Sequence, residues 1–224
     1  MMKLSQDTLA ILKNFSIIQP NLVVEPGSTI STLAEAKHIM AEATIDETFN
    51  HKFGIYDLNE FLSAVSLLED PELDISDSLM TIKADNARVN YHFADTEILT
   101  KKTQSIQMPP ADISFTFTQQ AINNIRRAAG ALNLDTPILS ITVEGEDIVA
   151  KVLCVNNPSS NSYSLIIGKH EGDPIESDFR FDINNLKLIN GDYTVDITKK
   201  LISNWKHQTK QIQYWIALDK TTQV

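Results

Sequence analysis

The hydrophobic pattern of the chain is clearest between Ile113 and Leu134, where its period changes. Ile113, Phe115 and Phe117 alternate with polar residues, as in a strand with one buried face. Thr118 follows, and its hydroxyl can cap a helix by accepting a hydrogen bond from a first-turn N–H. The next apolar residues recur at helical spacing; they are Ile122, Ile125, Ala129 and Leu132. The pattern predicts a strand that leads directly into an amphipathic helix.

The polar face of this helix is basic and rich in amides. On a helical wheel Arg127 points away from the apolar stripe, and Arg126 lies on its flank. Four amides surround them: Gln119, Gln120, Asn123 and Asn124. No acid occurs in residues 113–134, where 29 acids in 224 residues would give about three. Such a face suits a phosphate backbone, which attracts cations and accepts hydrogen bonds from amides. An ordinary surface helix with few acids is the alternative.

The pattern occurs twice along the chain. Residues 4–13 align with residues 117–126 at a constant offset of 113 (117 − 4), with a hydroxyl residue and Gln near the start and a base at the end. A second similarity links residues 53–59 with residues 179–184, where an aromatic and apolar strand leads into an Asp that can cap the next helix. Two copies of one unit, each near half the chain, indicate a duplicated domain.

The remaining periodic segments complete an α+β pattern. Three further helices are expected at Lys3–Phe15, Asp57–Leu68 and Asp182–Ile189. The other strand-like segments are Leu22–Val24, Thr29–Leu33, Ile39–Ala43, Phe53–Ile55, Glu72–Ser76, Met80–Ala84, Val89–Phe93, Ile138–Glu144, Asp147–Val155, Ser162–Gly168, Phe179–Phe181, Tyr193–Thr198, Leu201–Trp205 and Ile212–Leu218. About sixteen short strands and four helices favour antiparallel sheets with helices on one face.

A polar segment without a clear period divides the chain. Residues 1–110 are expected to form an N-terminal domain and residues 111–224 a C-terminal domain, with a connector at about 94–112. This connector carries four apolar residues, which pack onto a sheet or line a groove for a partner: Ile98, Leu99, Ile106 and Met108.

The net charge of the chain limits the kinds of nucleic-acid binding that it allows. The net charge of −10 and pI of about 4.9 argue against nucleic-acid binding unless the bases are gathered on one surface. Such a distribution is sufficient if the protein attaches topologically, as an encircling ring.

The single cysteine, Cys154, excludes an intramolecular disulfide and fits a reducing cytoplasm. Neither a transmembrane run nor a signal peptide is apparent, so a cytoplasmic protein without a membrane partner is expected.

Signals for catalysis are weak. The five histidines are scattered, and none forms a pair at metal-ligand spacing. There is no nucleophile elbow, no Walker loop and no dinucleotide fingerprint, and seven glycines make a glycine-rich cradle improbable. We therefore expect no catalytic residue, no metal and no cofactor, and a protein that is not an enzyme. A hydrolase with a dispersed site is an alternative.

Several short motifs resemble the DNA sliding clamps of T-even-like tailed phages, which are DNA polymerase processivity factors. These motifs are LSQDT at residues 4–8, LKNF at 12–15, IYDLNEFL at 55–62, SLL at 66–68 and GDY at 191–193. Length and order of elements fit along essentially the whole chain, more loosely in the second half.

The resemblance implies a homotrimeric ring with two clamp domains in each subunit, four helices around the hole and antiparallel sheets outside. It also implies duplex DNA as a non-specific, topological partner, a clamp loader, and a DNA polymerase whose peptide docks near the connector. Late transcription factors are a further implied partner. The second helix departs from a basic pore, because it has no Lys or Arg and exposes Glu60.

Carried onto this sequence, the resemblance gives the DNA-facing bases as Lys3, Lys13, Arg126, Arg127 and Lys187. The partner-binding residues expected from the composition of the connector are Ile98, Leu99, Ile106 and Met108. The main rival hypothesis is a non-enzymatic phage structural or assembly protein with a duplicated domain.

Overall fold

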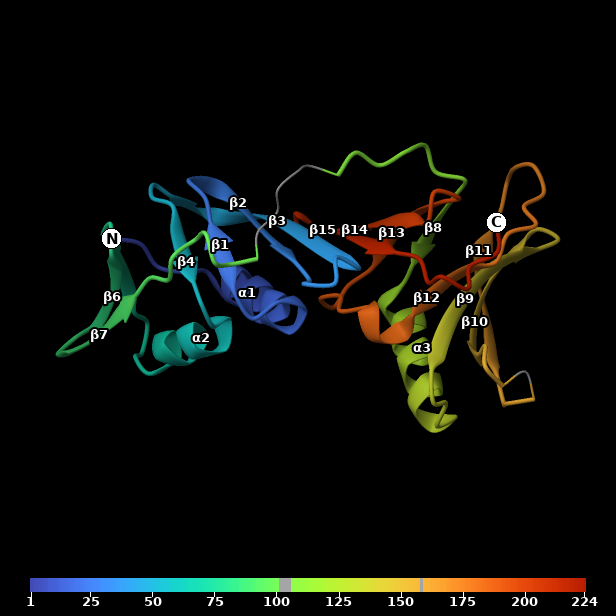
Figure 1. The fold of residues 1–224 in the computed structure, drawn as a ribbon, viewed down its shortest axis with the longest axis horizontal. Coiled ribbons are helices and arrows are strands. Elements are labelled where there is room, and N and C mark those ends of the chain that lie inside the picture. Colours follow the sequence, from blue (N-terminus) through green and yellow to red (C-terminus); the bar gives the residue numbers. More distant parts are fainter. Residues whose placement is uncertain (101–105, 158) are drawn as a thin grey trace. The chain divides into compact units, whose positions relative to one another are not determined.

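The computed structural model describes residues 1–100, 106–157 and 159–224 (Figure 1). The chain divides into two compact units, Met1–Ser105 and Ile106–Val224. The division falls at residue 105, where the sequence suggested 110. The expected connector, residues 94–112, lies partly outside the described residues.

Unit 1 contains two helices and seven strands among its described residues. They are α1 (Gln6–Ile18), β1 (Leu22–Val24), β2 (Gly27–Leu33), β3 (Ile39–Phe49), β4 (Phe53–Ile55), α2 (Leu58–Ser66), β5 (Glu72–Ile75), β6 (Leu79–Ala84) and β7 (Ala87–His92). β1 pairs with β4, β2 pairs with β3, and β5, β6 and β7 form a three-stranded sheet, all antiparallel.

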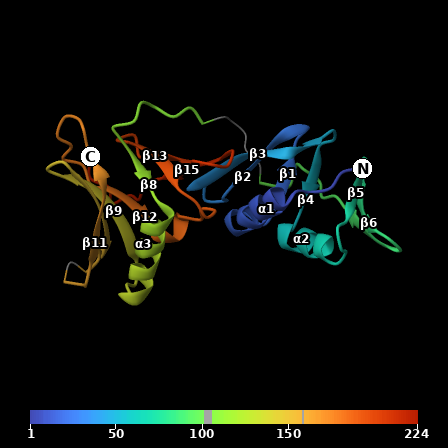
Figure 2. The same cartoon turned by 180° about the vertical axis from the view of Figure 1, so that it is seen from behind.

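The two helices of unit 1 lie side by side, as both views show (Figure 2), and α1 also packs on β3. Their apolar faces meet the strands in a core that contains Phe15 and Phe61. Phe61 makes an edge contact with Tyr91 of β7, with ring centroids 5.4 Å apart. Burial of these rings stabilises the helix layer on the strands.

Unit 2 contains one α-helix, one 3-10 turn and eight strands in its described part. They are β8 (Ile113–Phe117), α3 (Gln119–Ala131), β9 (Pro137–Glu144), β10 (Asp147–Cys154), β11 (Tyr163–Lys169), β12 (Phe179–Asp182), η1 (Ile183–Asn185), β13 (Tyr193–Thr198), β14 (Ile202–His207) and β15 (Ile212–Ala217). One antiparallel sheet has the order β11-β10-β9-β12, and the other runs β15-β14-β13-β8 within this unit.

The core of unit 2 is built around one tryptophan. Trp205 of β14 is fully buried and contacts Phe117 of β8, Phe181 of β12 and Tyr193 of β13, with centroid distances of 5.6, 5.8 and 6.4 Å. These rings come from both sheets, so Trp205 holds the two sheets together. The α+β class with antiparallel sheets is confirmed.

Predicted capping residues begin four segments, but the expected bounds of the first helix, Lys3–Phe15, are wrong. The helix runs Gln6–Ile18, because Ser5 caps it and residues 3 and 4 lie before the cap. The Thr8 N–H donates to the Ser5 hydroxyl at the start of α1 (3.1 Å). The corresponding bond in α3 runs from Ala121 to Thr118 (3.2 Å). The second similarity is matched too, because a capping Asp begins both segments: Asp57 accepts from two first-turn N–H groups, and Asp182 accepts from one. Shared capping geometry supports the duplication.

The fourth predicted helix, Asp182–Ile189, is wrong in its length. Only the 3-10 turn Ile183–Asn185 forms, and Leu186 leaves the helical region with φ −78° and ψ 59°. Leu186 and Leu188 are both buried. A spacing of two places both side chains on one face of an extended segment, whereas a helix would separate them. Tertiary burial therefore overrides the capping signal here.

Candidate nucleic-acid interface

The outward face of α3 is a shallow hollow of about 830 Å³. The residues that line it carry amide, hydroxyl, guanidinium and carboxylate groups: Thr118, Gln119, Gln120, Asn123, Arg126, Arg127 and Asp192. The amides supply donors and acceptors without charge, and the two arginines supply donors with charge. The face therefore has the chemistry that a phosphate backbone requires.

The start of α3 is fixed by the turn before β13. The Gln119 N–H donates to the Asp192 carboxylate (2.7 Å), while the Gly191 N–H donates to the Gln119 side-chain carbonyl. Gly191 has φ of +150°, and a Cβ there would lie 2.0 Å from Nε2 of His207. Only glycine fits this position. Because Asp192 already accepts from the first N–H of α3, the groups of this face that remain for an anion are side chains.

The two arginines of α3 differ in how they are held. Arg126 is half-buried and donates from Nη2 to the Leu186 carbonyl (2.7 Å). Burial lowers the pKa of its guanidinium, which nevertheless stays protonated because arginine titrates far above neutral pH. Arg127 is exposed and donates to the side-chain carbonyl of Asn124. Arg126 is thus a fixed charge, and Arg127 reaches into solvent.

Lys187 lies next to the carbonyl that holds Arg126. It follows Leu186 directly, is half-buried, and its N–H donates to the Asn185 carbonyl (2.9 Å). Arg126 and Arg127 of the predicted set therefore share the outward face of α3, and Lys187 follows the residue that Arg126 contacts.

In unit 1 the predicted bases are separated. Lys3 pairs with Asp70, and this hydrogen bond raises the pKa of the lysine. Lys13 is exposed and lines a groove of about 660 Å³ between α1 and α2. The exposed residues of α2 that line this groove are neutral, Asn59, Ser63 and Ser66, and the groove is also lined by Asp70. This face carries far less positive charge than that of α3.

A buried carboxylate at the start of α1 was not found from the sequence. Glu47 of β3 is 8% exposed and accepts hydrogen bonds from the Ser5 N–H and the Thr8 hydroxyl. A negative charge at a helix N-terminus is favourable because of the helix dipole. The contacts join residues about 40 apart, and the one available signal was an acid at an inward position between Ile45 and Phe49.

The four connector residues lie in different environments. Leu99 is buried, and a Cβ on Gly54 of β4 would lie only 2.8 Å from its Cδ1 atom. Ile98 is 72% exposed, while Ile106 and Met108 are partly exposed. Leu99 therefore fixes the start of the connector to unit 1, and Ile98 faces solvent.

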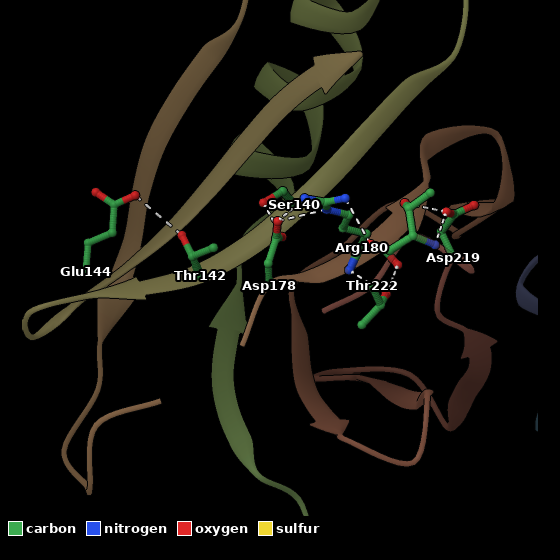
Figure 3. A network of polar contacts seen from close by, with 8 residues as sticks. Ser140, Thr142, Glu144, Asp178, Arg180, Asp219 and Thr222 are labelled. Carbon is green, nitrogen blue, oxygen red and sulfur yellow. Dashed lines mark hydrogen bonds and ion pairs between the residues drawn. The ribbon is translucent and has the colours of Figure 1, made fainter. Parts of the chain in front are cut away.

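A polar network holds the end of the chain against β12 (Figure 3). Arg180 forms an ion pair with Asp178 (2.6 Å), which also accepts from the Ser140 hydroxyl (2.6 Å). The guanidinium of Arg180 also donates to the Thr221 carbonyl (2.9 Å). The backbone N–H of Arg180 donates to the Thr222 hydroxyl (3.1 Å). The segment after β15 therefore covers one end of the β11-β10-β9-β12 sheet.

In each unit one sheet has a covered edge and an open edge, the β5-β6-β7 sheet in unit 1 and the β11-β10-β9-β12 sheet in unit 2. Gln223 forms a bridge to Asp178 beside β12, and Met2 forms a bridge to Leu73 of β5. The opposite ends of these sheets are β11 and β7, and neither pairs with another described strand of its own unit on its outer side. Ile166 on β11 is 61% exposed. Open edges of this kind are templates for pairing with another chain.

Metal-ligand groups and membrane-spanning helices are both missing from the described part of the chain. No group of three or more His, Cys, Asp or Glu residues there could hold a metal ion. None of its helices is both long and apolar enough to cross a membrane.

Comparison with known proteins gives consistent matches. The family model of DNA polymerase processivity factors matches residues 5–108. The sliding clamp of Enterobacteria phage T4 is 33% identical over 227 residues, with 97% of each chain covered. That of Escherichia phage RB69 is 30% identical, also with 97% of each chain covered. A structure of A. fulgidus PCNA with the C-terminal region of FEN-1 bound shares the fold, with a TM-score of 0.69, 11% identity and 94% of each chain covered.

Proposed function

The chain belongs to the sliding-clamp family of phage DNA polymerase processivity factors, and on this basis we propose that three copies close into a ring around duplex DNA. Its function is to keep the replicative polymerase on its template. The observation that carries the ring proposal is the duplicated unit with a basic helix face in a chain of net charge −10. A trimer would carry about −30 (3 × −10), so its bases must be gathered where DNA passes.

DNA is held, we propose, through phosphates alone. The DNA-facing set is Lys3, Lys13, Arg126, Arg127 and Lys187. Sliding over any sequence requires contacts that ignore the bases, because base contacts would create preferred stopping points. Weak contacts, partly bridged by water, let the ring move without a large barrier.

Ring closure is proposed to use the two open sheet edges. β7 of one copy would pair with β11 of the next, which extends both sheets and removes both exposed edges. The two edges belong to different units, so the contact is head-to-tail and repeats around the ring until it closes. The exposed Ile166 would be buried in this contact.

Partners are proposed to dock at the connector. Ile98, Ile106 and Met108 offer apolar surface for a peptide of the polymerase or clamp loader, and Leu99 anchors the segment beside them. In the A. fulgidus structure the partner segment is a chain terminus bound to the clamp. Late transcription factors would use the same surface, and the ring would work in the host cytoplasm during infection.

The connector proposal predicts the effect of one substitution. Met108→Asp should weaken binding of a polymerase C-terminal peptide at least tenfold, because it places a charge in an apolar contact, and it should not change the unfolding midpoint. Isothermal titration and thermal denaturation measure the two effects, and Gln107→Asp on the same segment is the matched control. Unchanged affinity would place the peptide site elsewhere.

Two measurements test the ring itself. Native mass spectrometry should give three times the mass of the 25.1 kDa chain. Clamp loaded on nicked circular DNA should remain bound through gel filtration, and linearising the circle should release it. A phage structural protein would show equal retention on circular and linear DNA, or none on either.

A further inference from the structure

The duplication allows the two helix faces to be compared position by position. α1 aligns with α3 at an offset of 113, and the hydroxyl caps of the two helices correspond. α2 aligns with η1 at an offset of 125 (182 − 57), and the capping aspartates correspond. The caps fix both alignments at their starts. Beyond Asn185, where η1 ends, residues of the second segment correspond in sequence position only.

Charge differs between the units at four corresponding positions. In each pair the residue of unit 2 is more positive by one charge: Asp7 and Gln120, Asn14 and Arg127, Glu60 and Asn185, Leu62 and Lys187. The fifth position is basic in both units, as Lys13 and Arg126. Two acids and one base give −1 in unit 1, and three bases give +3 in unit 2, a difference of four charges on one subunit.

The structure shows how this difference arises. In unit 1 the second segment is a full helix, α2, that lies along α1 (Figures 1 and 2). In unit 2 the same segment is a single turn, and the Leu186 carbonyl beyond it accepts from Arg126. Arg127 is exposed, whereas the corresponding Asn14 is only 7% exposed. The shortened segment therefore accompanies a more basic, more open helix face.

The other charges nearby do not cancel the difference. Asp192 lowers the total of unit 2 by one, but its carboxylate is bonded to the start of α3. Lys3 would raise the total of unit 1, but it is paired with Asp70. Including these groups leaves unit 2 at +2 and unit 1 at −1.

We infer that phosphate binding within each subunit is concentrated on unit 2, and that the α1–α2 face of unit 1 is a surface past which DNA moves with water between. This inference rests on the proposed function. The duplicated fold would offer six helix faces in a trimer, and the three of unit 2 would make most of the phosphate contacts. Fewer phosphate contacts lower the free-energy barrier to each step of sliding.

The test compares one base from each unit. Full-length clamp carrying Arg127→Ala or Lys13→Ala is loaded on DNA, and single-molecule tracking measures its diffusion coefficient over a range of salt concentrations. Both residues are exposed and lie on corresponding helices. Because each phosphate contact contributes about 0.9 to the salt slope of binding, Arg127→Ala should flatten the salt dependence and speed sliding at least twofold at low salt. Lys13→Ala should produce less than half of this effect.

A transplanted charge gives an independent check. Glu60→Asn with Leu62→Lys copies the residues of unit 2 onto unit 1 and should slow sliding at low salt at least twofold. Lys200→Ala, in the turn between β13 and β14, is the control for loss of a lysine elsewhere. Native mass of each variant verifies assembly.

The possible results separate the two proposals. If wild-type protein leaves circular DNA as fast as linear DNA, the ring proposal fails and this inference fails with it. If the ring is retained on circles but Lys13→Ala and Arg127→Ala act equally, the ring proposal stands and the concentration of binding on unit 2 is refuted.

Discussion

Glu47 is predicted to be a main support of unit 1. Replacing it with Ala removes the acceptor for the Ser5 N–H and for the Thr8 hydroxyl; Thr8 is buried and Ser5 is half-buried. A buried donor left without a partner costs about 1–3 kcal/mol. Loss of the charge beside the helix N-terminus adds about 0.5 kcal/mol. Part of this is offset because a carboxylate is no longer buried, so we expect Glu47→Ala to lower the free energy of unfolding by about 2–4 kcal/mol.

The assay can separate the two units. Both tryptophans, Trp205 and Trp215, lie in unit 2, so tryptophan fluorescence reports the unfolding of that unit alone. Far-ultraviolet circular dichroism reports both units. In urea, Glu47→Ala should shift an early part of the dichroism transition to lower denaturant, with a smaller effect on fluorescence.

Two control variants define the cause. Glu47→Gln keeps one acceptor oxygen and the side-chain volume, and should cost less than half as much as Glu47→Ala. Asp46→Ala removes an exposed acid from the same strand and should change stability by less than about 0.5 kcal/mol. If Glu47→Ala unfolds within about 0.5 kcal/mol of the wild type, the two hydrogen bonds do not support α1 as described.

Three further outcomes follow from unit 2. Gly191→Ala should destabilise it by about 3 kcal/mol or more, measured by the fluorescence transition, since the new methyl group meets a buried imidazole 2.0 Å away. Arg126→Ala should cost about 1 kcal/mol through its lost hydrogen bond, whereas Arg127→Ala should cost less than about 0.5 kcal/mol; equal losses would contradict the geometry. Burial raises the pKa of Tyr193 and Tyr214 above the ordinary value near 10. The unfolded chain therefore loses these protons first, and stability present below about pH 10 should fall as the pH rises further, so that tyrosinate absorbance from these two rings appears only with unfolding.

Features that depend on neighbouring residues were predicted well from the sequence. The strand before α3, the hydroxyl caps and the capping aspartates each need only a few adjacent side chains, so the duplicated unit was visible before the fold was known. The α+β class follows from the same local periods.

Features that depend on distant residues were missed or predicted incompletely. Glu47 and Ser5 are 42 positions apart, and Arg126 and Leu186 are 60 apart, so neither contact leaves a periodic trace in the sequence. The helix expected at Asp182–Ile189 had a correct start and an incorrect end, because the burial of Leu186 and Leu188 is decided by the sheets around them. The two units carry different numbers of basic residues on their helix faces, and the accompanying difference in length between α2 and η1 is visible only in the structure.

The unlike open edges, β7 and β11, have a consequence for how many partners the proposed ring would serve at once. Head-to-tail closure would relate the three copies by rotation alone, so all three connectors would face the same side of the ring. A polymerase that docks one peptide would use a single connector and leave two vacant. Three equivalent sites would also favour binding of the first partner, because any one of them could accept it. The vacant sites also allow a second protein to wait on the same ring, so that partners exchange without opening it.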